Sequence, residues 1–486
     1  MRRLHSSAPP KPRDLAILLF ALPLLVYVLS GPVFYGYDGE LMYRVSEGMV
    51  LRHSIQIVDP IYHYAQPYSP YGIGTSLALL PLVALGQLVL HDPRALVVLY
   101  LPVVGALTVV VLYGVLHELG VSRRWAAGLS LIYAFGTLAW HYSGVLFSEP
   151  LLALATMLAL LALLRFKRLG AARWLLLAGT GCAAAILARD DSVLLILPPL
   201  TVYAAIVVFQ RTRTPAARAL HAVAYLAPVA AAGMITLGYH VVRFGFGSGS
   251  YANDGIGFAQ PLLGGLYGLL LSPGAGLLVF VPILVLAFIG FPLLARWRRL
   301  EAWVLAALVL ARLLFFARWW DWMGGATWGP RYLVPLIPLM MVPAAFAIGI
   351  GWRRVAIALG VVGVGIELLG QLVPYGLYYG TIVPQLAERL GICRCVPAPS
   401  QGSRAINNLM AFDWRYAPLV GQLRDLLHGT IAPAWAPIAP LAMPVAIGAT
   451  VAIGLQIRRL ARQLDAADQP GLEPEERHPE AQPRIA

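Results

Sequence analysis

Long apolar segments separated by short polar ones recur along the chain, from about residue 15 to residue 455. Several hold about 18 or more predominantly apolar residues, the length an α-helix needs to cross the hydrocarbon core of a membrane. The strands of a membrane β-barrel would be shorter and would alternate apolar with polar residues. The pattern therefore predicts an all-α protein that crosses the membrane many times.

Twelve of these segments are predicted to cross the membrane. The first is Leu15–Val33 and the last is Trp435–Leu455. An even number of crossings places both ends of the chain on one side. The ten crossings between them are Ala95–His117, Trp125–Trp140, Pro150–Leu164, Trp174–Ala188, Ser192–Phe209, Leu220–His240, Gly274–Leu294, Trp303–Phe316, Tyr332–Gly351 and Val355–Leu372.

One further segment, Gly72–Leu90, is apolar and long enough to cross, but the charges that follow it argue against a crossing. If it crossed, six later basic clusters, beginning with Arg123-Arg124, would move to the outer side. Basic residues concentrate on the cytoplasmic side of membrane proteins. We therefore predict that Tyr35–Leu90 is an outer loop whose apolar end lies in the membrane interface, and that both termini are cytoplasmic.

The predicted organisation follows from these crossings. The tail is rich in Glu, Pro and Gln, a composition typical of disorder. The parts are a cytoplasmic N-terminus (1–14), a transmembrane core (15–372) that includes the first outer loop (35–90), an outer polar section (373–434), the last transmembrane helix (435–456) and a cytoplasmic tail (457–486).

Composition supports this class of protein. The chain is 59% hydrophobic and 12% charged, whereas soluble domains carry about 25% charged residues. The net charge of +13 would suit a nucleic-acid partner, but the basic residues sit in short clusters between apolar segments. Basic clusters in such loops indicate which side of the membrane each loop lies on. The protein is therefore predicted to lie in a cell membrane and to bind no nucleic acid.

The three cysteines leave their roles open. Cys182 lies in an apolar segment and is predicted to be a packing residue. Cys393 and Cys395 lie in the outer polar section, where a disulfide is one alternative and a two-thiol metal site is another.

Acidic residues and tyrosines gather in the first outer loop. Asp38 and Glu40 follow the first crossing, and Arg44 lies four residues after Glu40, so the two would share a helix face. A carboxylate at the outer interface is well placed to act as a general base. For Asp38 the alternative is an N-cap of the helix that follows.

Two later outer loops carry charges at the ends of crossings. Glu149 opens the fourth crossing, where capping is the alternative to substrate binding. Arg189 and Asp190 belong to an Arg-Asp-Asp triplet between two apolar segments, where a local ion pair is the alternative.

Arginines near the outer leaflet are the candidates for binding phosphate. Arg312 and Arg331 oppose the topology rule and are costly in hydrocarbon unless they are paired or bind an anion. Arg binds phosphate in bidentate fashion, and pairing with Asp321 or Glu367 is the alternative. Four tryptophans close by suit an aromatic belt, or stacking on a sugar: Trp319, Trp320, Trp322 and Trp328.

Four short motifs together resemble the GT-C superfamily of membrane glycosyltransferases, most of all the bacterial branch related to protein O-mannosyltransferases and lipid A aminoarabinose transferase. The resemblance covers roughly residues 15–460. Its carriers are Tyr37-Asp38-Gly39-Glu40, Tyr68-Ser69-Pro70-Tyr71-Gly72-Ile73-Gly74, Phe147-Ser148-Glu149-Pro150 and Trp328-Gly329-Pro330-Arg331-Tyr332-Leu333.

The resemblance implies two juxtamembrane helices in the first outer loop, Asp38 as the catalytic base, a polyprenyl-phosphate sugar donor and inversion at the anomeric carbon. Relatives often carry a Lys where this chain has Pro70, so Arg331, helped by Arg44 or Arg312, is expected to hold the donor phosphate. The residues expected to bind substrate are Glu40, Arg44, Tyr68, Tyr71, Glu149, Arg189, Asp190, Arg312, Trp328 and Arg331.

The predicted function is sugar transfer from a polyprenyl phosphate to a lipid, glycan or protein acceptor on the outer face of the membrane. No cofactor is required, although Glu149 offers a ligand for a divalent metal. The alternatives are a transporter or flippase of lipid-linked sugars and a non-catalytic protein that binds them. A transporter would place ionisable residues at the membrane midplane, whereas here most acids lie at outer ends of crossings.

Overall fold

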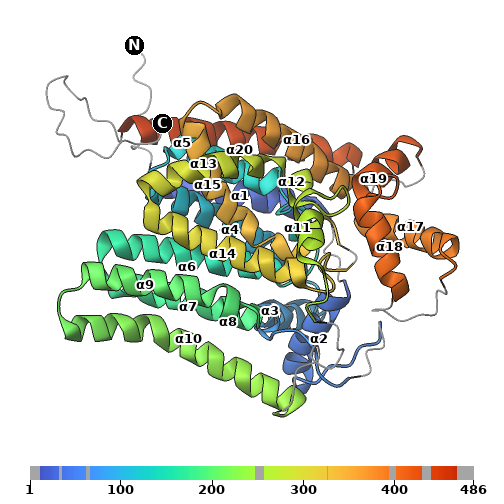
Figure 1. Ribbon diagram of the computed structural model, residues 1–486, viewed down its shortest axis with the longest axis horizontal. Helices are drawn as coiled ribbons and strands as arrows, with labels where there is room; N and C mark the ends of the chain where they lie inside the picture. The colour runs from blue at the N-terminus through green and yellow to red at the C-terminus, as the bar shows by residue number, and fades with distance from the viewer. Residues whose placement is uncertain are drawn as a thin grey trace.

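Helices account for almost all regular structure in the computed structural model (Figure 1). Among the residues that the structure describes, there is no β-strand. The described residues are 11–31, 36–61, 66–246, 257–325, 327–392, 401–429 and 439–467. The predicted pair Cys393 and Cys395 lies outside them.

A helix overlaps each of the twelve predicted crossings, and seven of the described helices are long and apolar enough to cross a membrane by themselves. The short helices α8 and α12 each precede a longer helix of the bundle. The bundle helices are α1 (Pro12–Leu29), α4 (Tyr100–Glu118), α5 (Arg123–Phe135), α6 (Glu149–Leu169), α7 (Ala172–Ala188), α8 (Ser192–Leu195), α9 (Leu197–Arg211), α10 (Pro215–Phe244), α12 (Leu277–Phe280), α13 (Val285–Trp297), α14 (Arg299–Arg318), α15 (Leu336–Gly349), α16 (Arg353–Leu372) and α20 (Ala439–Ala467).

Burial separates the central helices of the bundle from the peripheral ones. Every residue of α15 from Leu336 to Ile348 is buried, as expected for a helix that is apolar on all sides. In α10, by contrast, few side chains are buried, and large apolar ones such as Leu220 and Leu237 are exposed. An apolar helix with an exposed apolar surface is suited to face lipid, so α10 forms an edge of the bundle (Figure 1).

The basic loops meet at one end of the bundle. The backbone N–H groups of Arg123 and Arg124 donate to the carboxylate of Asp465, at 2.8 and 3.0 Å. Arg168 forms a 2.8 Å ion pair with Glu118 across two helix ends. Further contacts at this end join Lys167 to Glu301 at 2.5 Å and Arg211 to the backbone oxygen of Arg168 at 2.7 Å. The alternation of crossings predicted from charge therefore agrees with the structure.

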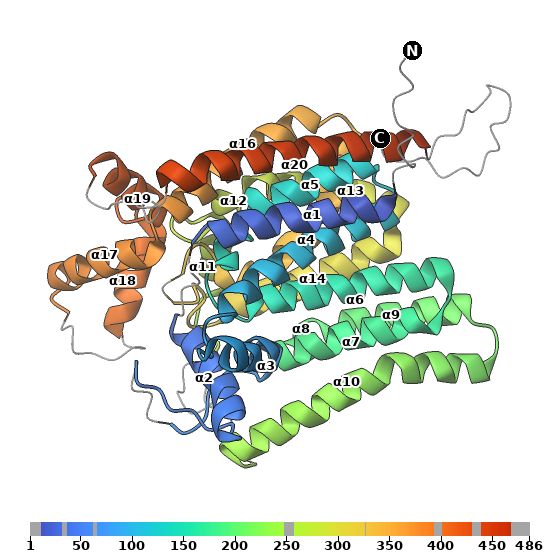
Figure 2. The same cartoon turned by 180° about the vertical axis from the view of Figure 1, so that it is seen from behind.

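The first outer loop lies at the opposite end and contains two helices, α2 (Tyr37–Arg52) and α3 (Gly74–Leu85). They pack against each other, and Figure 2 shows them close to the ends of α7 and α8. A Cβ atom at Gly74 would stand 2.5 Å from the backbone of Leu187 and Ala188, so only glycine lets α3 approach the end of α7 this closely.

The outer polar section also folds at this end of the molecule. It forms α17 (Tyr375–Arg389), α18 (Gln401–Phe412) and α19 (Pro418–Leu427), while α11 (Leu262–Leu271) packs on α14 nearby. In both views these helices project beyond the same end as α2 (Figures 1 and 2). The loops predicted to share the outer compartment are thus gathered around one region.

Candidate functional site

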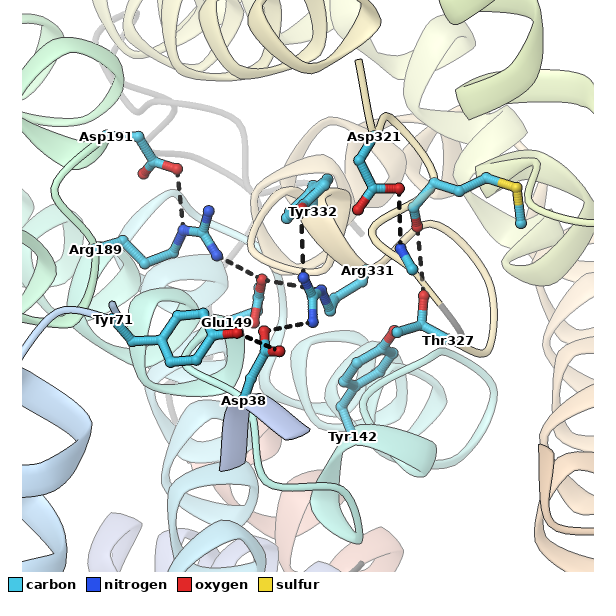
Figure 3. Close-up of polar contacts among 12 residues, drawn as sticks. Asp38, Tyr71, Tyr142, Glu149, Arg189, Asp191, Asp321, Thr327, Arg331 and Tyr332 are labelled. Atoms are coloured by element: carbon cyan, nitrogen blue, oxygen red, sulfur yellow. Dashed lines mark hydrogen bonds and ion pairs between the residues drawn. The ribbon is translucent and has the colours of Figure 1, made fainter. Parts of the chain in front are cut away.

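The side chain of Asp38 contacts residues from distant parts of the chain. Helix α2 begins at Tyr37 with Gly36 as its N-cap, so Asp38 lies in the first turn and does not cap it. Its Oδ1 accepts a 2.7 Å hydrogen bond from the hydroxyl of Tyr71, and its Oδ2 pairs with Nη1 of Arg331 at 2.8 Å (Figure 3). The carboxylate therefore faces tertiary partners and not its own helix.

Arg331 lies between two carboxylates. Its Nε is 3.6 Å from Oε1 of Glu149, and its guanidinium lies 4.4 Å from the centre of the Phe147 ring. Burial disfavours the charge, but Asp38 and Glu149 raise the pKa of Arg331 well above its ordinary value. The guanidinium does not form these pairs with Asp321 or Glu367, the alternative partners that were predicted from the sequence.

The ion pairs continue inward from Glu149. Its Oε1 accepts from Nη1 of Arg189 at 2.7 Å, and Nε of Arg189 pairs with Asp191 at 3.0 Å. The second oxygen of Asp191 is 3.5 Å from Nη1 of Arg312. We refer to this line of alternating charges as the charged row; its members are Asp38, Arg331, Glu149, Arg189, Asp191 and Arg312.

Exposure is uneven along the charged row. The side chains of Asp38 and Arg189 are 20% and 22% exposed, whereas that of Glu149 is 1% exposed and that of Arg312 is fully buried. Arg312 also donates from Nε to the backbone oxygen of Tyr332 at 2.5 Å. A ligand can therefore reach the row at Asp38 and Arg189 but not at Arg312, so this position does not favour the prediction that Arg312 helps to hold a phosphate.

The row is electrically balanced, because it contains three carboxylates and three guanidinium groups. Although burial acts in the opposite direction, Arg189 and Arg312 lower the pKa of Asp191. Glu149 already lies beside two arginines, which would repel a divalent metal, so its geometry does not fit the metal role suggested from the sequence.

Glu40 and Arg44, which were predicted to bind substrate, pair with each other and belong to a group separate from the charged row. Arg44 pairs with Glu40 at 2.8 Å and with Glu47 at 2.6 Å, so the predicted helix-face pair is present. Arg94 contacts Glu40 and lies 4.3 Å from the centre of the Tyr43 ring. We call the four charged residues the α2 brace: Glu40, Arg44, Glu47 and Arg94.

Three other predicted residues are not joined to the charged row by the contacts found. The hydroxyl of Tyr68 accepts a 3.4 Å hydrogen bond from Gln56 in an exposed position. Trp328 is fully buried against Phe280, so its ring cannot stack on a sugar without repacking. Asp190 is an exposed residue, although partial desolvation of its carboxyl raises its pKa.

Arg243, near the end of α10, was not among the site residues predicted from the sequence. Its Nη1 donates to the backbone oxygens of Ser69 and Tyr71, at 3.0 Å each, and its side chain is buried. Arg243 thus holds the segment from which Tyr71 reaches Asp38. The available signal was its position, since it is an arginine at the outer end of a crossing, where basic residues are unusual.

Several known proteins resemble this chain. Residues 85–230 match the family described as dolichyl-phosphate-mannose-protein mannosyltransferase. No curated protein sequence matches.

Solved structures resemble it in fold. ArnT from Cupriavidus metallidurans, bound to undecaprenyl phosphate, superposes with a TM-score of 0.50 at 16% identity, and the match covers 94% of this chain and 80% of that one. The oligosaccharyltransferase AglB from Archaeoglobus fulgidus, in complex with an inhibitory peptide and a dolichol-phosphate, gives a TM-score of 0.44 at 13% identity, over 85% of this chain and 55% of that one. With the all-helical architecture and the family match, the ArnT likeness shows that this chain has the GT-C fold of membrane glycosyltransferases, as its motifs indicated.

Proposed function

We propose that this protein is a glycosyltransferase that moves a sugar from a polyprenyl-phosphate donor to an acceptor hydroxyl. The observation that carries the proposal is the accessible ion pair of Asp38 and Arg331, placed in a GT-C fold. One member of the pair can accept a proton and the other can hold a phosphate. The undecaprenyl phosphate in ArnT and the dolichyl phosphate in the family description support a donor of this class.

Arg331 is the group that holds the donor phosphate. Because the charged row has no net charge, it attracts an incoming phosphate only weakly. The phosphate must therefore replace a carboxylate as the partner of an arginine. Asp38 is the carboxylate to be replaced, since it is the more exposed partner of Arg331. A guanidinium can bind two phosphate oxygens at once, which makes Arg331 better suited than a lysine to this exchange.

The same exchange prepares the base. When the phosphate binds Arg331, Oδ2 of Asp38 loses its ion pair and becomes available to the acceptor, while Tyr71 still donates to Oδ1. Loss of the neighbouring positive charge also makes the carboxylate more basic. Donor binding would therefore activate Asp38 at the moment at which a base is needed.

The reaction is a single displacement. The acceptor oxygen attacks the anomeric carbon from the face opposite the phosphate, and its proton goes to Asp38. The bond between the anomeric carbon and the phosphate oxygen breaks, and polyprenyl phosphate leaves with the electron pair. Arg331 balances the charge that develops on the leaving group, and the sugar is transferred with inversion.

The proposed side of the membrane follows from the basic loops. They share the end opposite the charged row, and the positive-inside rule assigns that end to the cytoplasm. The site then faces the outer compartment, and α17 to α19 lie where an acceptor would approach. The acceptor is a lipid, glycan or protein that carries a hydroxyl.

Donor turnover tests the proposal. Purified protein in lipid nanodiscs would be supplied with a panel of polyprenyl-phosphate sugars and a membrane extract as the acceptor source, and released polyprenyl phosphate would be measured. We expect release with one donor and inversion in the product. Tight donor binding with no release from any donor would contradict transfer and favour a protein that only binds lipid-linked sugars. Movement of the intact donor across sealed vesicles would favour a flippase.

A further inference from the structure

A cleft opens between α9 and α10 at the basic end of the molecule, far from the charged row. Its volume is about 310 Å³, at the lower end of the range for ligand pockets. Its walls are almost entirely apolar, and small residues of both helices leave the space open. Residues that define it include Thr201, Ala204, Phe209, Arg218, Ala222 and Tyr225.

The packing of α10 explains why the cleft exists. A Cβ atom at Gly179 of α7 would stand 2.1 Å from the backbone oxygen of Tyr225, so α10 lies directly against α7. The hydroxyl of Tyr225 is 3.3 Å from Sγ of Cys182 and 3.1 Å from the hydroxyl of Thr201. These contacts fix α10 to α7 and leave alanines, which are too short to fill the space, between α10 and α9.

The mouth of the cleft is polar and cationic. Nε of Arg218 donates to the backbone oxygen of Thr212 at 2.9 Å, and its guanidinium lies 4.8 Å from the centre of the Phe209 ring. The hydroxyl of Thr212 is 2.9 Å from Nδ1 of His221. From residue 205 to residue 226 the sequence contains three arginines, at 211, 213 and 218, and no acidic residue.

The cleft and the charged row lie at opposite membrane interfaces. Arg218 and Arg243 stand 25 residues apart on the same helix, which corresponds to about 38 Å along its axis and exceeds the hydrocarbon thickness of about 30 Å. Arg243 adjoins the row through Tyr71. A ligand in the cleft therefore occupies the leaflet opposite the proposed donor site.

We propose that this cleft is a binding site for an anionic phospholipid. One acyl chain lies between the apolar walls of α9 and α10, and the phosphate is held at the mouth by Arg218 with Arg213. Charge complementarity selects this occupant, since Arg218 lines the cleft together with no acidic residue and Arg213 lies five positions earlier in the sequence. Basic pockets between membrane helices are suited to anionic headgroups. The proposal does not rest on the proposed transferase activity.

Native mass spectrometry of the full-length protein tests the proposal by counting retained lipids. Delipidated protein would be titrated with phosphatidylglycerol or with phosphatidylcholine of the same acyl chains. We expect one tightly bound phosphatidylglycerol, and an affinity loss of about five-fold when Arg218→Gln removes one arginine. Arg218→Lys keeps the charge and should retain most of the affinity, which separates the loss of charge from misfolding.

Two further variants locate the site. Ala204→Trp fills the cleft and should abolish the tight lipid, whereas Arg354→Gln removes an exposed arginine at the start of α16 and should leave it bound. Equal retention of the two lipids, or equal losses in Arg218→Gln and Arg354→Gln, would overturn the proposal. Competition by soluble glycerophosphate at the lipid's own concentration would also overturn it, because the apolar cleft would then play no part.

Discussion

Asp38 and Glu40 lie two residues apart in the first turn of α2, yet the structure gives their carboxylates opposite situations. Asp38 is partly exposed, and its arginine comes from 293 residues further along the chain. Glu40 is fully buried and pairs with Arg44 on its own helix and with Arg94. The charged row brings distant segments together at an accessible point, whereas the α2 brace fixes a helix to its neighbourhood.

The comparison teaches how a functional carboxylate differs from a structural one. An ion pair formed by neighbours on one helix is completed as soon as that helix packs, and the carboxylate of Glu40 is then fully buried. The pair of Asp38 and Arg331 can exchange partners, because one of its members is open to a ligand. Variants in the two groups should therefore fail in different ways.

The largest effect on activity is expected for Asp38→Asn. It removes the proposed base and keeps the size of the side chain, so transfer should fall by about 100-fold to 10,000-fold, the usual contribution of a general base. Donor affinity should rise, because the phosphate no longer has to displace a carboxylate from Arg331, and the melting temperature should shift only slightly.

The matched control for Asp38→Asn is Asp14→Asn in the first turn of α1, which should be as active as the parent protein. Full transfer by Asp38→Asn would contradict the role of this carboxylate.

Arg331 should show the next largest effect. Arg331→Lys keeps the charge but loses bidentate binding, so donor affinity should weaken by about ten-fold or more while Asp38 remains in place. Arg331→Gln leaves Asp38 without its cation and Glu149 with Arg189 alone, and should also lower stability. Isothermal titration with polyprenyl phosphate alone measures the affinity. Unchanged binding by both variants would show that the phosphate binds elsewhere.

Arg243 sharpens the comparison, since it holds the backbone of Tyr71, whose hydroxyl donates to Asp38. We expect Arg243→Gln to reduce kcat by about ten-fold, because a small misplacement of a catalytic group is costly. Arg243→Lys should restore part of the rate. KM for the donor should stay near the parent value, and a loss that appeared only in thermal stability would assign Arg243 a structural role alone.

The α2 brace should respond in stability and much less in chemistry. Glu40→Ala removes the buried carboxylate that Arg44 and Arg94 share and leaves Arg44 with Glu47 alone, and a broken buried pair costs about 3 kcal/mol of unfolding free energy. The protein that remains folded should turn over at nearly the parent rate. Thermal unfolding and the rate per folded molecule would be measured together, and a lost rate with unchanged stability would place Glu40 among the catalytic groups.

The smallest effect concerns pH. Arg189 and Arg312 lower the pKa of Asp191 below its unfolded value, which is about 4. The folded protein then binds fewer protons there than the unfolded protein, so this contribution is present above pH 4 and is lost as pH falls. Melting temperatures between pH 6 and pH 3.5 should fall less steeply for Asp191→Asn than for the parent; equal slopes would contradict the assignment.

The helices of the bundle could be predicted because a segment that lies in the membrane must be apolar along its length. Each apolar segment long enough to cross coincides with a helix. The charge of the later loops also placed Gly72–Leu90 outside the bundle. Polar residues at outer ends of crossings led to Asp38, Glu149, Arg189 and Arg331, which the structure joins.

The pairing of these residues could not be predicted. Spacing along a helix reveals only local pairs such as Glu40 with Arg44, and hydropathy does not give the rotation of one helix against another. For this reason Trp328 and Arg312 were expected to bind substrate and are buried, and the bond from Arg243 to the Tyr71 backbone was not predicted. The contacts that shape the site come from packing of segments far apart in the chain.

A structure of the protein with bound polyprenyl phosphate tests the central claim most directly, because the claim is that Asp38 gives up Arg331 to the donor. We expect a phosphate oxygen at hydrogen-bond distance from the Arg331 guanidinium, with the ion pair to Asp38 broken and Tyr71 still bonded to it. A phosphate bound elsewhere, with Asp38 and Arg331 still paired at 2.8 Å, would contradict the account.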